Sequence, residues 1–379
     1  MKDPEETSQE PAQHGRKRAE PVNERADEPP RIISWNITLR CPLRCAHCYI
    51  TAGADETAGV LTTDEALAVI DQIRAAGRPV VVLSGGEPLM RDDLCEIARY
   101  GTERGLRMVM GTSGYLLDRS MASRLRDAGI RAAAISIDSV IPSVHDSFRG
   151  VTGAWEKAVL AIRNCRDEGI GVQINMTALR PSTGDVESVV EFGKGLGVKD
   201  YQIFFPVQTG RAKDTVPPDP RQHEEVIRQV LLKYRDTGVN IRPTCAPQFR
   251  RIAAEAGIEN PAWGRGCIAG ISYCRIYANG DVTPCPYLPV SAGNVRSAPF
   301  GEIWSRSPVF LALRNPALLT GKCGRCEYQG ICGGCRARAY RGTDAFSHRW
   351  CDGLEQPRTI AGELCAEDPW CPYEPGGRT

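Results

Sequence analysis

Short apolar, β-branched runs alternate with longer amphipathic segments through the first part of the chain. The runs lie at 32–39, 79–84, 107–113, 132–138, 171–179 and 201–207. The segments between them begin near Thr, Asp or another polar residue and end at Gly, as helices commonly do. Strands that alternate with helices in this way predict βαβ units and a parallel sheet.

Six such units are fewer than the eight of a closed TIM barrel. A partial (β/α)6 barrel of the TIM type accommodates them, and so does a doubly wound open sheet. Both folds place chemistry on the loops that follow the carboxyl ends of the strands. The string CPLRCAHC follows the first run and GGEP follows the second. We therefore expect the two motifs to share one rim and one site.

The pattern changes after about residue 240. Helical periodicity fades, and Gly, Pro and Cys become frequent in strings such as GKCGRCEYQGICGGCRARAY. Such a segment buries little apolar surface and is expected to need bound metal to hold it. The sequence thus predicts an α/β domain at 31–240 and a cysteine-rich domain at 241–379. Residues 1–30 are polar and proline-rich, which predicts a disordered tail, and 341–362 is expected to be a surface insertion.

Charge and cysteine content narrow the class of protein. The 47 Lys and Arg residues balance 46 Asp and Glu residues to a net charge of +1, so no basic footprint for nucleic acid is expected. No apolar run is long enough to span a bilayer, and the N-terminus lacks a secretory signal. Sixteen cysteines in such a chain favour metal ligands over disulfides and predict a cytoplasmic protein.

Three cysteines fall close together in the loop after the first run: Cys41, Cys45 and Cys48. Thiolates in the pattern C-x3-C-x2-C can hold three corners of a [4Fe–4S] cluster, which leaves the fourth iron without a protein ligand. A structural zinc site needs four ligands. For the triplet alone, a zinc site or a partial redox motif is the alternative.

The triplet, the aromatic Tyr49 and the string GGEP after the next strand together resemble the radical S-adenosylmethionine (SAM) superfamily. The resemblance implies an enzyme whose open iron binds the amino and carboxylate groups of SAM. One-electron reduction then cleaves SAM to methionine and a 5′-deoxyadenosyl radical. A low-potential donor such as a flavodoxin or ferredoxin is the implied electron source.

The same resemblance assigns further SAM contacts. Tyr49 is expected near the adenine, and Gly85, Gly86 and Glu87 at the methionine ammonium. The remaining contacts are Ser136 and Asp138 near the carboxylate and ribose, Arg149 at the carboxylate, and Asn175. Strand-end hydrogen bonding is the alternative for Ser136 and Asn175, and a helix or turn cap is the alternative for Asp138.

The cysteine-rich region resembles the SPASM extension of radical SAM enzymes, although CGGC has two residues where the usual pattern has three. The resemblance implies one or two auxiliary [4Fe–4S] clusters. The expected ligands are Cys267, Cys274, Cys285 and Cys335 for one cluster, and Cys323, Cys326, Cys332 and Cys371 for the other. Cys245, Cys351 and Cys365 are possible substitutes, and Cys95 and Cys165 are expected in the core. Zinc at the paired C-x2-C motifs is the alternative.

The strings GISYCRIYANGDVTPCPYLPV and AEDPWCPYEP add a finer similarity to the tetrapyrrole-processing enzymes of alternative heme and heme d1 biosynthesis. It implies an iron tetrapyrrole substrate whose propionates lose a β-hydrogen atom to the 5′-deoxyadenosyl radical, and then CO2 and an electron, to become vinyl groups. Arg336, Arg338 and Arg341 would bind the carboxylates or offset cluster charge. The alternatives are a SPASM maturase acting on a peptide or protein side chain, and a non-catalytic iron–sulfur carrier.

Overall fold

The computed structural model describes residues 28–376 except 57, 180–183, 216, 262 and 342–363. The expected tail therefore lies outside the described residues apart from 28–30. The expected insertion lies outside them apart from the backbone of residue 341. No helix among the described residues is long and apolar enough to cross a membrane.

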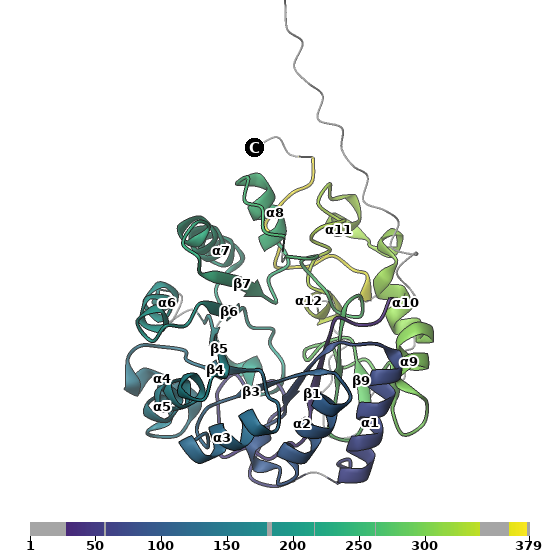
Figure 1. Cartoon of the computed structure of the whole chain (residues 1–379). Coiled ribbons are helices and arrows are strands. Elements are labelled where there is room, and N and C mark those ends of the chain that lie inside the picture. The colour runs from purple at the N-terminus through teal and green to yellow at the C-terminus, as the bar shows by residue number, and fades with distance from the viewer. Residues whose placement is uncertain are drawn as a thin grey trace, which may run out of the picture.

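The core of the fold is one sheet with the strand order β10-β9-β8-β1-β2-β3-β4-β5-β6-β7. The six expected runs form parallel strands: β1 (Ile32–Asn36), β2 (Val80–Ser84), β3 (Arg107–Thr112), β4 (Ala132–Ser136), β5 (Gly171–Thr177) and β6 (Asp200–Phe204). Figure 1 shows the strands in a curved array with helices around the outside. Because neighbouring strands are consecutive in the chain, the partial barrel is confirmed over a doubly wound sheet, whose strand order reverses.

The expected helices are also present between the strands. They are α1 (Thr63–Ala76), α2 (Leu94–Glu103), α3 (Arg119–Asp127), α5 (Ala154–Asp167), α6 (Asp185–Gly195) and α7 (Pro220–Tyr234). A capping box starts α1, since Thr62 Oγ1 accepts from Glu65 N at 3.3 Å and the Glu65 carboxylate accepts from Thr62 N at 2.8 Å. The short α4 (Pro142–Arg149) precedes α5 and was not expected as a separate helix.

The cysteine-rich region contributes strands to both edges of this sheet. On one edge, β7 (Asn240–Thr244) pairs in parallel with β6 and carries Pro243, which an edge strand tolerates. On the other, β8 (Tyr273–Ile276) pairs in parallel with β1 and continues into the antiparallel β9 (Asp281–Thr283) and β10 (Gly293–Asn294). The sheet therefore runs across the expected boundary at 240/241, whose position remains a proposal.

Short elements complete the C-terminal part. They are the helices α8 (Phe249–Glu255), α9 (Phe300–Arg306), α10 (Pro308–Arg314), α11 (Gly321–Arg325) and α12 (Arg336–Arg341), and the 3-10 turn η5 (Pro316–Leu318). A large apolar core lies between the sheet and its helices. A second, smaller core contains Leu288, Val309 and Leu364 together with the buried Cys335 and Cys365.

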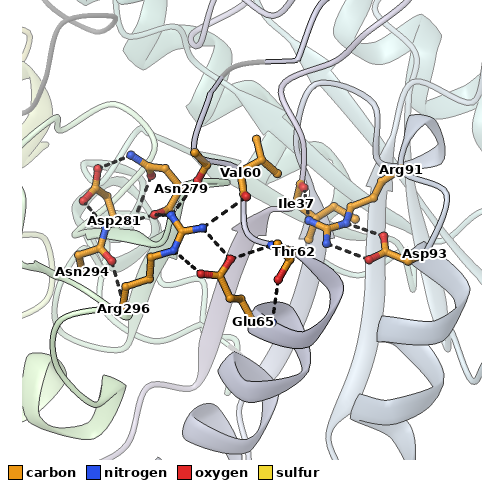
Figure 2. A network of polar contacts seen from close by, with 11 residues as sticks. Ile37, Val60, Thr62, Glu65, Arg91, Asp93, Asn279, Asp281, Asn294 and Arg296 are labelled. Atoms are coloured by element: carbon orange, nitrogen blue, oxygen red, sulfur yellow. Dashed lines mark hydrogen bonds and ion pairs between the residues drawn. The ribbon is translucent and has the colours of Figure 1, made fainter.

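Arg296 joins the C-terminal part to the start of α1, as Figure 2 shows. Its guanidinium pairs with both oxygens of Glu65, at 2.7 and 2.6 Å, and donates to the Gly59 carbonyl at 2.8 Å. Its backbone N–H donates to Asn294 Oδ1 at 2.9 Å. One side chain thus links the turn after β10 to the loop that leads into the first helix.

Candidate active site

The three-cysteine loop follows β1 and is held by its neighbours through backbone hydrogen bonds. Cys41 N donates to Gly53 O at 2.6 Å. Arg44 N donates to Arg149 O at 3.1 Å, which ties the loop to the end of α4. The Arg211 guanidinium donates to the Cys45 carbonyl at 2.9 Å. Contacts with the end of α4 and with Arg211 therefore hold the cysteine loop in place.

The GGEP loop after β2 packs directly on the cysteine loop. Gly86 N donates to Thr38 O at 2.9 Å, and Glu87 N donates to Arg40 O at 2.8 Å. A Cβ atom at Gly85 would lie 2.4 Å from Thr38 O, and one at Gly86 would lie 2.3 Å from Arg40 O. The two motifs meet at one rim, as the sequence predicts, and the glycines have a packing reason beside their expected contact with SAM.

Glu87 is fully buried and bridges the ends of β2 and β3. Its carboxylate accepts from Thr112 Oγ1 at 2.7 Å, from Ser113 N at 2.9 Å and from Ser113 Oγ at 2.5 Å. Burial raises the pKa of this carboxyl, while the hydrogen bonds act in the opposite direction. Its expected contact with the methionine ammonium stays a prediction.

Asp138 and Arg149 form a buried ion pair beside Cys45. Arg149 Nε lies 2.6 Å from Asp138 Oδ2, and Thr177 N donates to Asp138 Oδ1 at 3.0 Å. Burial raises the pKa of Asp138, but the Arg149 guanidinium, the nearby histidines and the Thr177 N–H together outweigh it and hold that pKa below its usual range. Arg149 Nη1 is also 3.8 Å from Cys45 Sγ. The arginine therefore places positive charge next to an expected cluster ligand.

Ser136 and Asn175 are register partners at the ends of β4 and β5. Asn175 Oδ1 accepts from Gln173 Nε2 at 2.7 Å, so strand-end hydrogen bonding is present. Both side chains are partly exposed on the inner face of the curved sheet, whereas the intervening Ile135 and Ile174 are buried against the helices. Their expected SAM contacts stay predictions.

Tyr49 lies in a half-buried aromatic cluster that the sequence did not predict. Arg275, on β8, donates to the Tyr49 hydroxyl and to Asn36 Oδ1. The Tyr49 ring meets Tyr287 edge-on, with the ring centroids 5.4 Å apart. The missed signal was an arginine in the middle of the apolar run SYCRIY.

The first expected auxiliary ligand set is only partly brought together. The thiols of Cys267, Cys285 and Cys335 lie within electrostatic range of one another. Cys274 lies apart from them, because it sits on β8 opposite Ile33 with its side chain in the large apolar core. The Cys245 thiol, by contrast, is close to all three.

The second expected set is brought together around one pocket. The thiols of Cys323, Cys326, Cys332 and Cys371 all line this pocket. Asp368 N donates to Cys323 Sγ at 3.4 Å. A Cβ at Gly334 would lie 2.7 Å from the same sulfur, so only glycine leaves this wall open. Four thiols and a backbone N–H aimed at sulfur fit an iron–sulfur cluster.

Three of the other cysteines lie in the apolar cores instead. Cys165 is buried and Cys95 partly buried in the large core, as expected. Cys365 is buried in the smaller core, and Cys351 lies outside the described residues. Among the described residues, no three His, Cys, Asp or Glu side chains converge as they would around a single metal ion.

Two family models match the chain where these sites lie. Residues 35–193 match the model of the radical SAM superfamily. The chain belongs to this superfamily. Residues 267–336 match the SPASM iron–sulfur cluster-binding domain. This radical SAM enzyme therefore uses SAM, a [4Fe–4S] cluster and auxiliary iron–sulfur clusters, for which the three-thiol loop and the second thiol set are fitting sites.

Curated relatives extend the similarity over nearly the whole chain. An AdoMet-dependent heme synthase of Methanosarcina barkeri is 39% identical over 92% of this chain and 97% of that protein. A pre-heme d1 synthase of Dinoroseobacter shibae is 29% identical over 90% of this chain and 86% of that protein. A mycofactocin maturase of Mycobacterium tuberculosis is 29% identical over 84% and 81% of the two chains.

A solved structure shows the same fold. Streptococcus suis SuiB bound to S-adenosylmethionine superimposes with a TM-score of 0.70 over 91% of this chain and 77% of that chain. The two sequences are only 17% identical, so the match concerns the fold alone.

Proposed function

We propose that this radical SAM enzyme oxidatively decarboxylates propionate side chains of an iron tetrapyrrole in heme or heme d1 biosynthesis. The observation that carries the proposal is the 39% identity to a heme synthase over 97% of that protein's length. The similarity therefore spans the SAM-binding half and the cysteine-rich half together. We also propose a cytoplasmic location and a flavodoxin or ferredoxin as the electron donor.

In this proposal, Cys41, Cys45 and Cys48 hold the SAM-binding cluster. When bound, the cluster and SAM supply the 5′-deoxyadenosyl radical. Arg149 offsets the negative charge of the thiolates through its position 3.8 Å from Cys45 Sγ. The GGEP loop fixes the cysteine loop from the β2 side, which keeps the three thiols at one rim of the sheet.

The inner face of the sheet suits a large, partly polar substrate. Closed TIM barrels fill their interior with bulky branched side chains. Here several inward positions carry small or polar residues that remain partly exposed, among them Ala134, Ser136, Asn175 and Gln202. The outward positions between them are buried against the helices. This asymmetry leaves the inner face available to substrate.

Arg275 is our candidate for binding a substrate carboxylate. It is only 3% exposed, and its described partners are the neutral oxygens of Asn36 and Tyr49. Its Nε has no partner in the described structure, and its guanidinium carbon lies 4.8 Å from the Tyr49 ring centroid. A buried cation without an anion is costly. A propionate would complete its coordination.

The arginines expected to bind the carboxylates are instead engaged with the protein. Arg338 pairs with Asp368, Nη2 to Oδ2 at 2.8 Å, and donates to the Cys245 carbonyl at 2.6 Å. Arg336 donates to the carbonyls of Leu364 and Ala366 at 3.1 and 2.7 Å. The side chain of Arg341 lies outside the described residues. This arrangement supports the alternative in which such arginines offset charge near the clusters.

The test of the function is an anaerobic turnover assay on the reconstituted protein with SAM, a strong reductant and iron-coproporphyrin III. Mass spectrometry would follow both the nucleoside and the porphyrin. Formation of 5′-deoxyadenosine with loss of CO2 from the porphyrin is the expected result. Deoxyadenosine with an unchanged porphyrin would overturn this substrate and direct the assay to didecarboxysiroheme and then to peptides.

Variants of Arg275 test its role in the same assay. Replacing a charge-assisted hydrogen bond costs about 1.5–3 kcal/mol, so Arg275→Met is expected to raise KM for the porphyrin about 10- to 100-fold. Arg275→Lys keeps the charge and is expected to lose less. Cleavage of SAM without porphyrin and the iron content serve as controls for folding. An unchanged KM in Arg275→Met would exclude the carboxylate contact.

A further inference from the structure

Cys245 has an unusual backbone conformation. It follows β7 directly, and its φ angle is +59°, in the left-handed region. Among the described residues only Thr51 is a second non-glycine residue with positive φ. Such a conformation costs a non-glycine residue about 1 kcal/mol or more and persists where the surroundings hold it, commonly at functional sites.

The surroundings of Cys245 hold it firmly. Its carbonyl accepts from Arg338 Nη1 at 2.6 Å. Arg338 pairs with the buried Asp368, and the same carboxylate accepts from Cys335 N at 2.8 Å. One ion pair thus fixes the backbone at Cys245 and at Cys335, two cysteines that are far apart in the sequence.

The side chain of Cys245 completes a group of four thiols. Cys245 and Cys285 both pack against the smaller core, which includes Cys335. Its thiol lies within electrostatic range of those of Cys335, Cys285 and Cys267. The four residues come from the end of β7, the loops on either side of the β8–β9 hairpin, and the segment before α12.

Cys274, the expected fourth ligand, faces the wrong way. Side chains alternate along a strand. On β8, Cys274 and Ile276 face the large apolar core, while Arg275 faces the inner side with Tyr49. The charged neighbour of its thiol is Arg314 and not another cysteine. Reaching the other thiols would require turning β8 over, which would bury Arg275 in the apolar core.

We propose that Cys245, with Cys267, Cys285 and Cys335, ligates an auxiliary [4Fe–4S] cluster, and that Cys274 is a core residue. Cluster binding releases protons, because thiolates are the ligands. Cys245 lies beyond the stretch that the SPASM model matches, 267–336, so the motif alone does not include it. The assignment does not depend on the identity of the substrate.

Two tyrosines connect the proposed cluster site with the SAM-binding loop. Tyr287, two residues after Cys285, meets Tyr49, which directly follows Cys48. The thiol set that includes Cys245 is therefore the one adjoining the aromatic cluster next to the radical site. Substrate oxidation would release its electron towards this set first.

The test compares Cys245→Gly with Cys274→Ala in the full chain, reconstituted anaerobically. Glycine adopts φ +59° freely, so a loss of iron in this variant cannot come from backbone strain. Iron and sulfide per chain are expected to fall by about four each in Cys245→Gly, or the cluster to persist with an altered electron paramagnetic resonance spectrum. Both results support the ligand.

The matched variant separates ligand loss from loss of fold. Cys274→Ala is expected to keep the wild-type iron, sulfide and spectrum, with a modest fall in thermal stability from the lost core contacts. A wild-type iron content and spectrum in Cys245→Gly would overturn the proposal. So would loss of iron in Cys274→Ala at unchanged circular dichroism. Neither measurement involves porphyrin, so failure here and failure of the proposed function are distinguishable.

Discussion

The two cysteine-bearing parts of the molecule are supported in different ways. The three-thiol loop sits on a sheet with a large apolar core and is held by backbone bonds to residues 53 and 149 and by the GGEP loop. The C-terminal thiol sets lie among short elements, such as α11 and η5, around a smaller core. The first site is thus expected to keep its shape without iron. The second is expected to depend on its clusters for folding.

Cys45→Ala should show the largest effect, and it removes a thiol from the three-thiol loop only. It is expected to abolish SAM cleavage, a loss of at least about a thousandfold given typical enzymatic accelerations. Iron in the auxiliary sites is expected to remain, because their thiols come from other segments. The measurement is 5′-deoxyadenosine formation beside iron content. Loss of all iron would show that the two parts do not hold their clusters separately.

Asp368→Asn tests the support of the C-terminal part. The change leaves Arg338 buried without its counter-ion, and breaking a buried pair costs about 3–5 kcal/mol. The melting temperature and the auxiliary iron content are both expected to fall. SAM cleavage without substrate is expected to be retained.

The matched control is Asp236→Asn, because the Asp236 side chain is 83% exposed in its pair with Arg235. Little change is expected there. Equal effects of the two substitutions would contradict the role given to the buried pair.

His223 lies where the barrel part of the chain contacts the C-terminal part, and its variant tests this contact. Its ring stacks on Phe205 at 4.1 Å and meets Trp370 edge-on at 6.0 Å. Burial lowers its pKa to about 3, so the folded protein keeps it neutral while the unfolded chain binds a proton below about pH 6.5. Stability contributed by this group is therefore lost as pH falls, by about 1 kcal/mol between pH 6.5 and 5.5.

His223→Phe removes that proton and is expected to flatten the pH dependence by this amount. Denaturant unfolding at the two pH values measures it. His145, whose pKa burial lowers to about 4, remains in both proteins and serves as an internal reference. An identical slope in the variant would show that His223 does not titrate between the two states.

The sequence predicted the barrel well and the sheet edges poorly. The strands β1 to β6 were predictable because apolar runs alternate with capped, amphipathic helices. The strand at 240–244 contains Pro243, and that at 273–276 has only four residues, so neither carries a clear strand pattern. Edge pairing is decided by tertiary contacts that local propensity does not encode.

The sequence motifs of the site were predictable, but the residues that strand pairing brings next to them were less so. The resemblance to the SPASM pattern placed Cys274 in the first auxiliary set, whereas the alternation of β8 turns its side chain to the core. The same resemblance gave Cys245 only as a possible substitute, because its proximity to the other thiols depends on β7 pairing with β6. Arg275 lies in no motif, and its place beside Tyr49 follows from the pairing of β8 with β1.

The pairing of β1 with β8 has a consequence for synthesis on the ribosome. One edge of β1 pairs with β8, which is synthesised about 240 residues later in the chain. At 5–20 residues per second this interval lasts about 10–50 s. During that time the unpaired backbone of β1 is a template for wrong pairing. The nascent barrel is therefore the stage at which chaperone binding would matter most for this protein.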